Sequence, residues 1–351
     1  MTASAPQPTP DSTLPPDPRS AARNAWARAH GAAAEPVRAS MDAGFRSYWR
    51  LSTDQGSRIL MDSPPELEDV RPWLRVRALL EGGGVRVPRV LAEDATAGFL
   101  LLEDLGTDTY LHALHGDNAD ALFDDAVTQL LRLQAIAPPA ELPAYDEALL
   151  ARELRLFDEW FCGRHLGLAL DCGDLEALDA AYRVLIDRAL AQPQVLVHRD
   201  FMPRNLMPTG GGPASDGPAV LDFQDAVRGP IAYDVLSLFK DAFLSWPEQR
   251  VDGWLDRYHA RAAAAGLPVP GRARFRRDAD LIGIQRHLKV IGIFARLKHR
   301  DGKPRYLADV PRFFAYLDAV LPAYPELAGL SRFIEHKVKP GIARLAAVVR
   351  E

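Results

Sequence analysis

Residues 195–207 read VLVHRDFMPRNLM, and residues 219–226 read AVLDFQDA, with a glycine-rich stretch between them. Each segment begins with a short apolar run, which is typical of a buried strand. The first run is followed by His-Arg-Asp, ending at Asp200, with Asn205 five residues later. The second run is followed by Asp222. The pattern therefore predicts two neighbouring loops that carry three polar side chains behind short strands.

Side chains of these types suit phosphoryl transfer. In that reaction the moving group carries spread negative charge, so catalysis consists mostly of positioning and charge neutralisation. Magnesium prefers oxygen ligands and usually takes only one or two from the protein. Asn205 and Asp222 could supply these ligands from two sides. A separate carboxylate must accept the proton of the attacking hydroxyl, and Asp200 is the candidate for this general base.

The bulk composition limits the possible classes of function. The chain has 351 residues, of which 48% are hydrophobic and 25% charged, with a net charge of −5. These values indicate a globular protein of one large domain or two lobes, and no nucleic-acid binder. Cys162 and Cys172 are too few for a disulfide framework, and their spacing is not a zinc pattern. No stretch resembles a signal peptide or a membrane span, so we expect a cytoplasmic protein without a membrane partner.

The first part of the chain is predicted to be rich in strands. Residues 1–18 contain much Pro, Ser and Thr, so we expect a flexible tail. A helix is predicted from Asp17 and Pro18 to Gly31. FRSYWRL (45–51) and SRILMD (57–62) flank the turn sequence TDQG and predict a β-hairpin.

One helix interrupts these strands. Residues 63–84 predict a helix that is opened by Pro64 and Pro65, is closed by glycines and has a possible kink at Pro72. The stretches 85–94 and 99–105 predict two further strands. Three apolar patterns with helical spacing then follow, and the chain after residue 233 is again mostly helical; these three patterns cover residues 120–136, 150–167 and 175–190.

HRDFMPRN and LDFQDA resemble the catalytic and metal-binding loops of the aminoglycoside phosphotransferase and choline kinase superfamily, which is related to protein kinases. The resemblance covers nearly the whole chain after the tail. It implies an α+β, bilobal protein-kinase-like fold. In this fold a small N-lobe (19–105) contains an antiparallel sheet and one main helix, and a larger C-lobe (106–351) is mostly helical. ATP would lie between the lobes.

The same resemblance assigns roles to individual residues. It implies that Asp200 is the catalytic base and that Asn205 and Asp222 are magnesium ligands. His198 would orient the catalytic loop, and Asp234, in GPIAYDVLSLF, would brace it from the start of a helix.

Two segments resemble the nucleotide-binding parts of this superfamily. GFLLLEDLG resembles the hinge between the lobes, where backbone groups of Glu103 and Leu105 would meet the adenine edge. DAGFRSYWRL stands where the phosphate-covering loop belongs, and it contains a single glycine. The expected nucleotide contacts in this loop are Gly44, Phe45, Arg46 and Ser47.

One departure from the kinase pattern concerns a lysine. Protein kinases carry a lysine on the next strand, where it pairs with the α- and β-phosphates. SRILMD has none, and Met61 stands near that position, so the carboxylates of Glu66 and Glu68 lack their usual partner. Three arginines could supply the charge, and the sequence does not choose among them: Arg46, Arg50 and Arg58.

Several longer segments resemble the anomeric sugar kinases of bacterial cell-wall (peptidoglycan) recycling, among them MDSPPELED and QRHLKVIGIFARLKHRDGKPRYL. That resemblance implies phosphorylation of the C1 hydroxyl of N-acetylmuramate and N-acetylglucosamine. Basic and aromatic residues would contact such a sugar, because arginine is the natural partner of a carboxylate. The candidate substrate contacts are Glu153, Trp160, Arg286, His287 and Arg296.

Two alternatives stay open at this point. The acceptor could instead be an aminoglycoside, choline or homoserine. The absent lysine also admits a non-catalytic, ATP-binding pseudokinase. Either way the expected partners are small molecules, and we expect a monomer.

Overall fold

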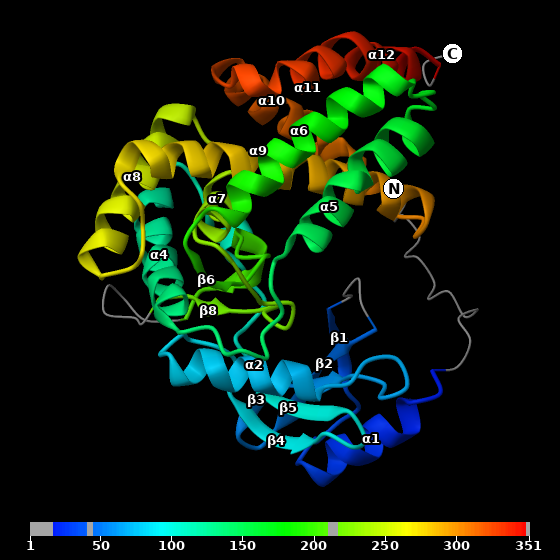
Figure 1. Cartoon of the computed structure of the whole chain (residues 1–351). Coiled ribbons are helices and arrows are strands. Elements are labelled where there is room, and N and C mark those ends of the chain that lie inside the picture. Colours follow the sequence, from blue (N-terminus) through cyan, green and yellow to red (C-terminus); the bar gives the residue numbers. More distant parts are fainter. Residues whose placement is uncertain (1–16, 41–44, 210–216, 349–351) are drawn as a thin grey trace, which may run out of the picture. The chain divides into compact units, whose positions relative to one another are not determined.

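The computed structural model describes residues 17–40, 45–209 and 217–348, and Figure 1 shows the whole chain. The expected tail lies outside the described residues up to position 16. The chain divides into two compact units. The smaller unit comprises residues 1–72 and 88–104, and the larger one comprises residues 73–87 and 105–351. Residues 73–87 thus group with the larger unit, whereas the lobe limits predicted from the sequence place them in the N-lobe; those limits stay a prediction.

The smaller unit is built on an antiparallel five-stranded sheet with the order β1-β2-β3-β5-β4. The predicted hairpin forms its centre, with Tyr48 opposite Met61. The strands are β1 (Val37–Ser40), β2 (Ser47–Thr53), β3 (Gly56–Asp62), β4 (Val90–Asp94) and β5 (Phe99–Glu103).

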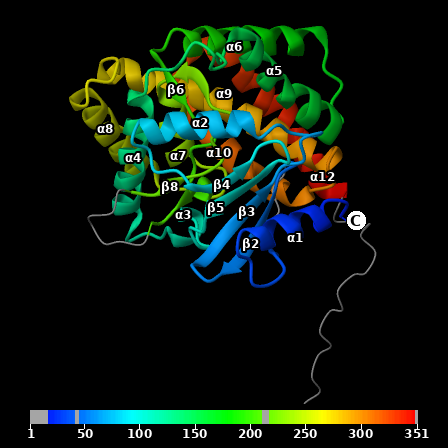
Figure 2. The ribbon, with the colours of Figure 1, turned by 90° about the horizontal axis from the view of Figure 1, so that it is seen from below.

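Helix α1 (Ser20–Ala29) packs on this sheet, as Figure 2 shows. Ala27 of the helix is buried together with sheet residues such as Leu60 and Phe99. The predicted helix is therefore confirmed, and its apolar face explains why it needs the sheet.

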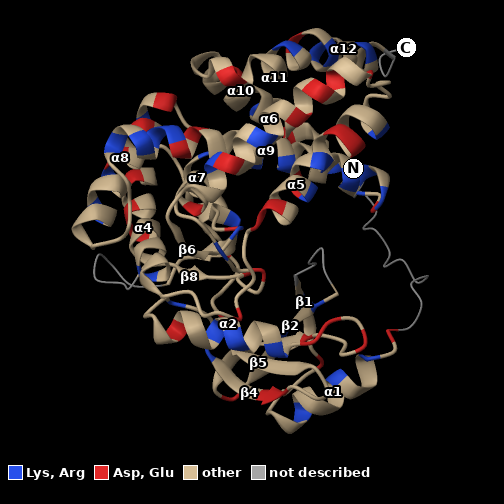
Figure 3. Cartoon of the chain, in the orientation of Figure 1, with Lys and Arg blue, Asp and Glu red and all other residues tan. Residues whose placement is uncertain are grey.

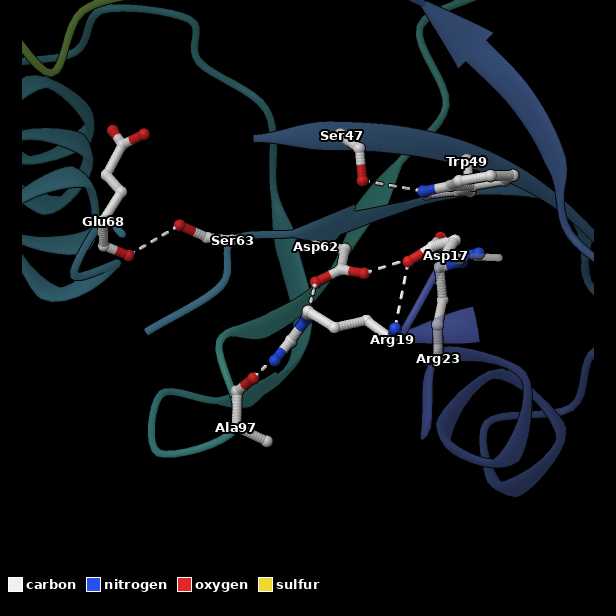
Figure 4. A network of polar contacts seen from close by, with 9 residues as sticks. All are labelled: Asp17, Arg19, Arg23, Ser47, Trp49, Asp62, Ser63, Glu68 and Ala97. Atoms are coloured by element: carbon white, nitrogen blue, oxygen red, sulfur yellow. Dashed lines mark hydrogen bonds and ion pairs between the residues drawn. The ribbon is translucent and has the colours of Figure 1, made fainter. Parts of the chain in front are cut away.

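A charged clamp also holds α1 to the sheet (Figure 4). Arg19 Nε lies 2.7 Å from Asp62 Oδ1, and Arg23 Nη1 lies 3.2 Å from Asp62 Oδ2. Arg23 also stacks over Trp49, with its Cζ atom 3.7 Å from the ring centroid. The Asp62 side chain is buried, and a carboxylate in that position requires such cationic partners.

The helix predicted over 63–84 begins later than expected. It is α2 (Arg71–Gly82), and residues 65–67 form a turn outside any helix, so the prediction of a start at Pro64 and Pro65 is wrong. Pro72 stands in the first turn instead of kinking the helix. Proline has no N–H for the carbonyl of residue 68, so the helix cannot continue upstream of this point without losing that bond. The Asp69 side chain accepts the Arg71 amide at 3.0 Å and closes the turn before the helix.

Gly98 makes the link between β4 and β5 possible. Its φ is +76°, and a Cβ atom there would lie 1.9 Å from the Ser63 carbonyl oxygen. Its own carbonyl accepts the Ser63 amide at 2.9 Å. Only glycine fits such a close approach at positive φ.

The larger unit is mostly helical. Its longest helix, α9 (Arg272–His299), contacts most of the others and is buried over much of its length. Most of α2 also groups with this unit. The remaining helices of eight or more residues are α4 (Ala119–Ala135), α5 (Glu147–Leu156), α6 (Cys172–Leu190), α7 (Ala232–Phe239), α8 (Glu248–Ala264), α10 (Val310–Val320) and α12 (Lys339–Val348), together with the π-helix η1 (Phe157–His165). The short helices are α3 (Tyr110–Ala113), η2 (Pro203–Asn205), η3 (Pro304–Asp309), η4 (Leu321–Ala323), η5 (Pro325–Leu327), α11 (Ala328–Phe333) and the π-helical turn η6 (Ile334–Val338).

Two small antiparallel sheets carry the loops singled out by the sequence. One pairs β6 (Gln194–Val197) with β9 (Val227–Pro230), and the other pairs β7 (Leu206–Met207) with β8 (Ala219–Val220). An α+β fold with an antiparallel sheet in the smaller unit and a mostly helical larger unit is thereby confirmed.

Charges of both signs are interspersed along α8 and α9, in keeping with the modest net charge (Figure 3). None of the described helices is long and apolar enough to span a bilayer.

Candidate active site

The centre of the candidate site is the loop 198–205, which follows the buried strand β6. His198 is fully buried, and its backbone amide donates to Asp234 Oδ2 at 2.7 Å. Its Nδ1 accepts the Asp200 amide at 3.2 Å, so its Nε2 is the atom that donates to the Leu221 carbonyl at 2.9 Å. Burial lowers the pKa of His198 despite the nearby Asp234, which keeps the ring neutral in this role. The histidine therefore ties the 198–205 loop to the strand that leads to Asp222.

Arg199 gives the loop its unusual backbone. Its φ is +74°, in the left-handed region that side chains other than glycine rarely adopt. The Arg199 amide donates to Asp234 Oδ1 at 3.0 Å, so the two oxygens of one carboxylate hold two successive amides. Asp234 itself is fully buried in the first turn of α7. Burial raises the pKa of Asp234 to about 6, against the opposing effect of His198 and of both amides.

Asp200, Asn205 and Asp222 are brought together through the backbone. Asn205 Nδ2 donates to the Asp200 carbonyl at 2.9 Å, and the Leu221 amide donates to the Asn205 carbonyl at 2.9 Å. Asp222 follows directly with a φ of +64°, and its Oδ1 accepts Gln224 Nε2 at 2.8 Å. The three side chains chosen from the sequence thus stand on two hydrogen-bonded loops.

The structure lets us test whether these groups suit a magnesium ion. The amide nitrogen of Asn205 is used by the loop, which leaves the side-chain oxygen of Asn205 available as a donor atom, and the Asp222 carboxylate stands on the loop that is hydrogen-bonded to it. Within the described residues no group of three or more His, Cys, Asp or Glu could hold a metal. Magnesium does not need such a group, because it usually keeps several waters and takes few protein oxygens. The pair therefore fits that ion.

A buried charge cluster supports the loop from behind. Arg199 Nη2 donates to Glu153 Oε1 at 2.5 Å, and Lys289 Nζ lies 3.0 Å from the same oxygen. Lys289 also donates to the Tyr233 hydroxyl at 3.0 Å, and the Tyr145 hydroxyl donates to Glu153 Oε2. Burial alone would raise the pKa of Glu153, but Lys289 and Arg199 together hold it below its usual value. The cluster keeps its charges paired, as buried ionised groups require.

The residues expected at the nucleotide stand in the smaller unit, apart from Leu105. Phe45 is 62% exposed, whereas Arg46 is buried. The Ser47 hydroxyl accepts Trp49 Nε1 at 2.8 Å. Glu103 accepts the Arg89 amide at 2.8 Å and donates its own amide to the Arg89 carbonyl at 3.0 Å.

Two of the expected nucleotide contacts do not lie among the described residues of the smaller unit. Gly44 lies outside the described residues, and Leu105 is half-buried in the larger unit.

The structure distinguishes the three arginines that could replace the missing lysine. Arg46 Nε lies 3.2 Å from Glu68 Oε1. Arg50 is paired with Asp104 at 2.6 Å, and Arg58 donates to the neighbouring Ser57 carbonyl at 2.8 Å. Arg46 is therefore the buried arginine that meets a carboxylate singled out from the sequence. Met61 is fully buried in β3.

The residues expected to contact the acceptor lie in different environments. Glu153 belongs to the buried cluster described above, and Trp160 is half-buried with Arg164 stacked on it, 4.8 Å from its ring centroid. Arg286 is buried and donates to the Lys240 carbonyl at 3.3 Å. His287 is buried and stacks on Tyr316, with 4.9 Å between the ring centroids.

Arg296 is half-buried, and no ion pair holds it among the described residues. The roles of all five residues in substrate binding stay predictions.

Sequence reasoning missed two sets of residues. Lys289 has the appearance of one more charge on a helix, and only its burial beside Glu153 shows its role. Arg204, Phe243 and Tyr306 form a second set, in which the guanidinium carbon of Arg204 lies 5.3 Å from the Phe243 ring centroid. Arg204 stands inside the quoted motif, so it could have been noticed, but nothing in the sequence places the two aromatic residues beside it.

Comparison with known proteins agrees with this geometry. Residues 35–277 match the model of a phosphotransferase enzyme family. The chain belongs to that family. The phosphotransferase is 53% identical over 89% of its length to an N-acetylmuramate/N-acetylglucosamine kinase of Pseudomonas putida, covering 90% of that protein. It is 45% identical over 83% of its length to a kinase of the same name from Neisseria meningitidis, covering 87% of it.

Solved structures show the same fold at low identity. An ADP-bound aminoglycoside phosphotransferase matches with a TM-score of 0.55 and 16% identity, over 81% of this chain and 93% of that one. A microcompartment-associated aminopropanol kinase matches with a TM-score of 0.58 and 15% identity, over 85% and 96% of the two chains. The kinase-like fold expected from the sequence is confirmed.

Proposed function

We propose that this protein transfers the γ-phosphate of ATP to the C1 hydroxyl of N-acetylmuramate and N-acetylglucosamine. The observation that carries the proposal is the 53% identity to an N-acetylmuramate/N-acetylglucosamine kinase over 89% of the chain. The site supports it independently, since the three side chains that phosphoryl transfer requires stand on two bonded loops. A reaction that consumes ATP also favours a cytoplasmic location.

In this mechanism Asp200 accepts the proton of the sugar hydroxyl as the oxygen attacks the γ-phosphorus. The position of Asp200 depends on the hydrogen bonds of its loop. The Asp200 amide donates to the His198 ring, and the amides of His198 and Arg199 donate to the Asp234 carboxylate. The neutral His198 adds no positive charge next to the base. The loop therefore presents a carboxylate in a fixed place, and positioning is the larger part of catalysis in phosphoryl transfer.

Asn205 and Asp222 would hold magnesium, which when bound neutralises charge on the phosphate oxygens. The Gln224 amide donates to Asp222 at 2.8 Å and fixes the carboxylate in place. The backbone bond from Leu221 to Asn205 keeps the two ligand positions at a constant separation.

Arg46 would supply the cation that kinases usually take from a strand lysine. Its ion pair with Glu68 at 3.2 Å resembles the lysine–glutamate pair of kinases in its charges. A guanidinium can also bind phosphate oxygens in bidentate fashion. This pairing supports a catalytic protein over the pseudokinase alternative.

Phosphorus NMR tests the function directly. The full chain is mixed with ATP, magnesium and one acceptor at a time: N-acetylmuramate, N-acetylglucosamine, kanamycin, choline or homoserine. We expect a sugar 1-phosphate signal that is coupled to the anomeric proton, for the two amino sugars alone. Transfer to one of the other acceptors would keep the fold and overturn the substrate, whereas ATP binding without any transfer would favour the pseudokinase.

Asp200→Asn tests the general base within the same assay. We expect kcat to fall by about 10²–10⁴, the usual contribution of a positioned base. Asp187→Asn, at an exposed position on α6, is the control for the charge change and should leave turnover unaltered. Near wild-type turnover in Asp200→Asn would refute the role of this carboxylate.

A further inference from the structure

Three aromatic rings form a cluster in the larger unit. Phe294 of α9 is buried, and its centroid lies 6.2 Å from Phe243 and 5.3 Å from Tyr306. The rings of Phe243 and Tyr306 are 6.5 Å apart, and both side chains are only half-buried. The partly exposed rings of Phe243 and Tyr306 thus pack against the buried ring of Phe294.

The polypeptide holds Phe243 firmly. It follows α7 in a turn in which the buried Asp241 carboxylate accepts the amides of Phe243 and Leu244 at 2.9 and 3.1 Å. Such an aspartate fixes the backbone of the next residues. Tyr306 belongs to η3, which packs closely on α9. The two rings therefore have defined positions before any ligand binds.

Arg204 joins this cluster to the candidate active site. It directly precedes Asn205 in η2, and its guanidinium carbon lies 5.3 Å from the Phe243 centroid. The side chain is exposed and makes no ion pair with any residue that the structure describes. Burial would raise the pKa of Tyr306, but Arg305 and Arg204 together lower it, which places positive charge beside the tyrosine hydroxyl. A cation that has no carboxylate partner among the described residues is thus held on an aromatic face next to the predicted magnesium ligand.

We propose that Phe243 and Tyr306 form the platform for the acceptor sugar and that Arg204 binds the carboxylate of N-acetylmuramate. This inference rests on the proposed function and names residues that discriminate between its two sugars. The two acceptors differ by a carboxylate-bearing ether group, which an arginine can bind in bidentate fashion. Sugar rings present C–H faces that pack on aromatic rings, and a fixed platform limits the loss of entropy on binding.

The arrangement also explains why a cation is needed on this particular loop. The chemistry brings together ATP, a carboxylate base and an anionic sugar, so negative charges accumulate near Asp200. Arg204 offsets part of this repulsion only for the acceptor that carries a charge. N-acetylglucosamine gains nothing from it beyond the contact with the platform.

A second pair of an arginine and an aromatic residue provides the matched comparison. Arg164 stacks on Trp160 at 4.8 Å, is exposed, and makes no ion pair among the described residues. This pair stands on η1, which carries none of the three candidate catalytic groups. Trp160 is also the aromatic substrate contact expected from the sequence, so the comparison decides between the two sites.

The experiment measures kcat/KM of the full chain for both sugars at saturating ATP and magnesium, in the wild type, Arg204→Met and Arg164→Met. We expect the ratio of N-acetylmuramate to N-acetylglucosamine to fall about 10- to 100-fold in Arg204→Met, as for the loss of a charged hydrogen-bonded pair. Arg164→Met should keep the wild-type ratio. Arg204→Lys should restore part of the ratio, because the charge returns without the planar fork. Phe243→Leu should raise KM for both sugars alike.

Three outcomes would overturn this inference while leaving the proposed function intact. An unchanged ratio in Arg204→Met would show that its guanidinium does not bind the carboxylate. A change of the ratio in Arg164→Met instead would move the sugar to Trp160. A rise in the KM for ATP in Arg204→Met, with equal losses for both sugars, would assign Arg204 to phosphate. Absence of transfer to either sugar in the wild type would refute the proposed function itself and this inference with it.

Discussion

Asp234→Asn is the substitution that best separates catalytic positioning from stability in this protein. The carboxylate accepts the amides of His198 and Arg199 at 2.7 and 3.0 Å and is fully buried. An asparagine keeps one acceptor oxygen and turns its NH₂ group toward the other amide. One backbone N–H is then left without a partner in the interior, which costs about 1–3 kcal/mol.

A second contribution has the opposite sign. Burial raises the pKa of Asp234 to about 6 from a reference of 3.8, so the ionised carboxylate is disfavoured in the folded protein at neutral pH. A difference of about two pKa units corresponds to ~3 kcal/mol, and the neutral asparagine removes this cost. Because the two contributions have opposite signs and similar sizes, we expect the free energy of unfolding to change by no more than about 2 kcal/mol.

Catalysis should respond differently, because the backbone of Arg199 is strained. Its φ of +74° costs on the order of 1–3 kcal/mol and persists only while its surroundings enforce it. Once the amide bond is lost, the loop can relax and Asp200 leaves its position. If the barrier rises by the same amount, kcat falls about 5- to 150-fold.

The assay combines urea unfolding with steady-state kinetics between pH 5 and 8. The folded state binds the Asp234 proton more tightly than the unfolded chain, so this group adds stability as pH falls from about 6 toward 3.8. Protonation of Asp234 also removes one of the acceptors for the two loop amides, so kcat of the wild type should decline below pH 6. This decline of kcat with falling pH should be weaker in Asp234→Asn. Wild-type kcat in the variant, or a stability loss above about 3 kcal/mol, would refute the reasoning.

Two further predictions concern the charged groups. Lys289→Met should lower the free energy of unfolding by about 3–5 kcal/mol, because Glu153 stays buried with one cation fewer. The control is Lys298→Met, on the same helix but without an ion pair among the described residues, which should lower the free energy of unfolding by about 0.5 kcal/mol or less. Equal losses of stability in the two variants would contradict a special role of Lys289. Arg46→Ala and Glu68→Gln should each raise the KM for ATP about tenfold, since the ion pair at 3.2 Å orients the Arg46 guanidinium. The control is Glu66→Gln, at an exposed position, which should leave the KM for ATP unaltered. An unaltered KM in both Arg46→Ala and Glu68→Gln would show that another group binds the phosphates.

The sequence was sufficient to predict most elements of the fold. The period-2 pattern of the hairpin and the helical spacing of 120–136 and 175–190 are local signals, and they depend on neighbours in the chain. The start of α2 was missed because proline at residues 64, 65 and 72 gives the same signal at each position. The start of the helix at Arg71 is set by two hydrogen bonds, from the Arg71 amide to the Asp69 side chain and from the Ser63 hydroxyl to the Glu68 carbonyl. The positions of the prolines in the sequence do not reveal these bonds.

The candidate site shows a sharper limit. Asp200, Asn205 and Asp222 could be named because one short motif contains them. Lys289 could not, since its role depends on a carboxylate contributed by another helix. In an apolar helix a lysine looks the same whether solvent or Glu153 compensates its charge. The acceptor residues were predicted from chemical type alone, and that criterion cannot distinguish Arg296 or Trp160 from Arg204 and Phe243.

The charge cluster around Glu153 also bears on the order in which the chain can fold during synthesis. Gln285, on the same helix as Lys289, contacts Glu153 across 132 residues of sequence. A nascent chain that has emerged as far as Asp222 contains the proposed base and both proposed metal ligands, but it lacks Lys289, the second cation that pairs with the buried Glu153. The buried cluster around Glu153 can therefore be completed only after Gln285 and Lys289 of α9 have left the ribosome. The charged support behind the loop is thus completed later in synthesis than the motif that it supports.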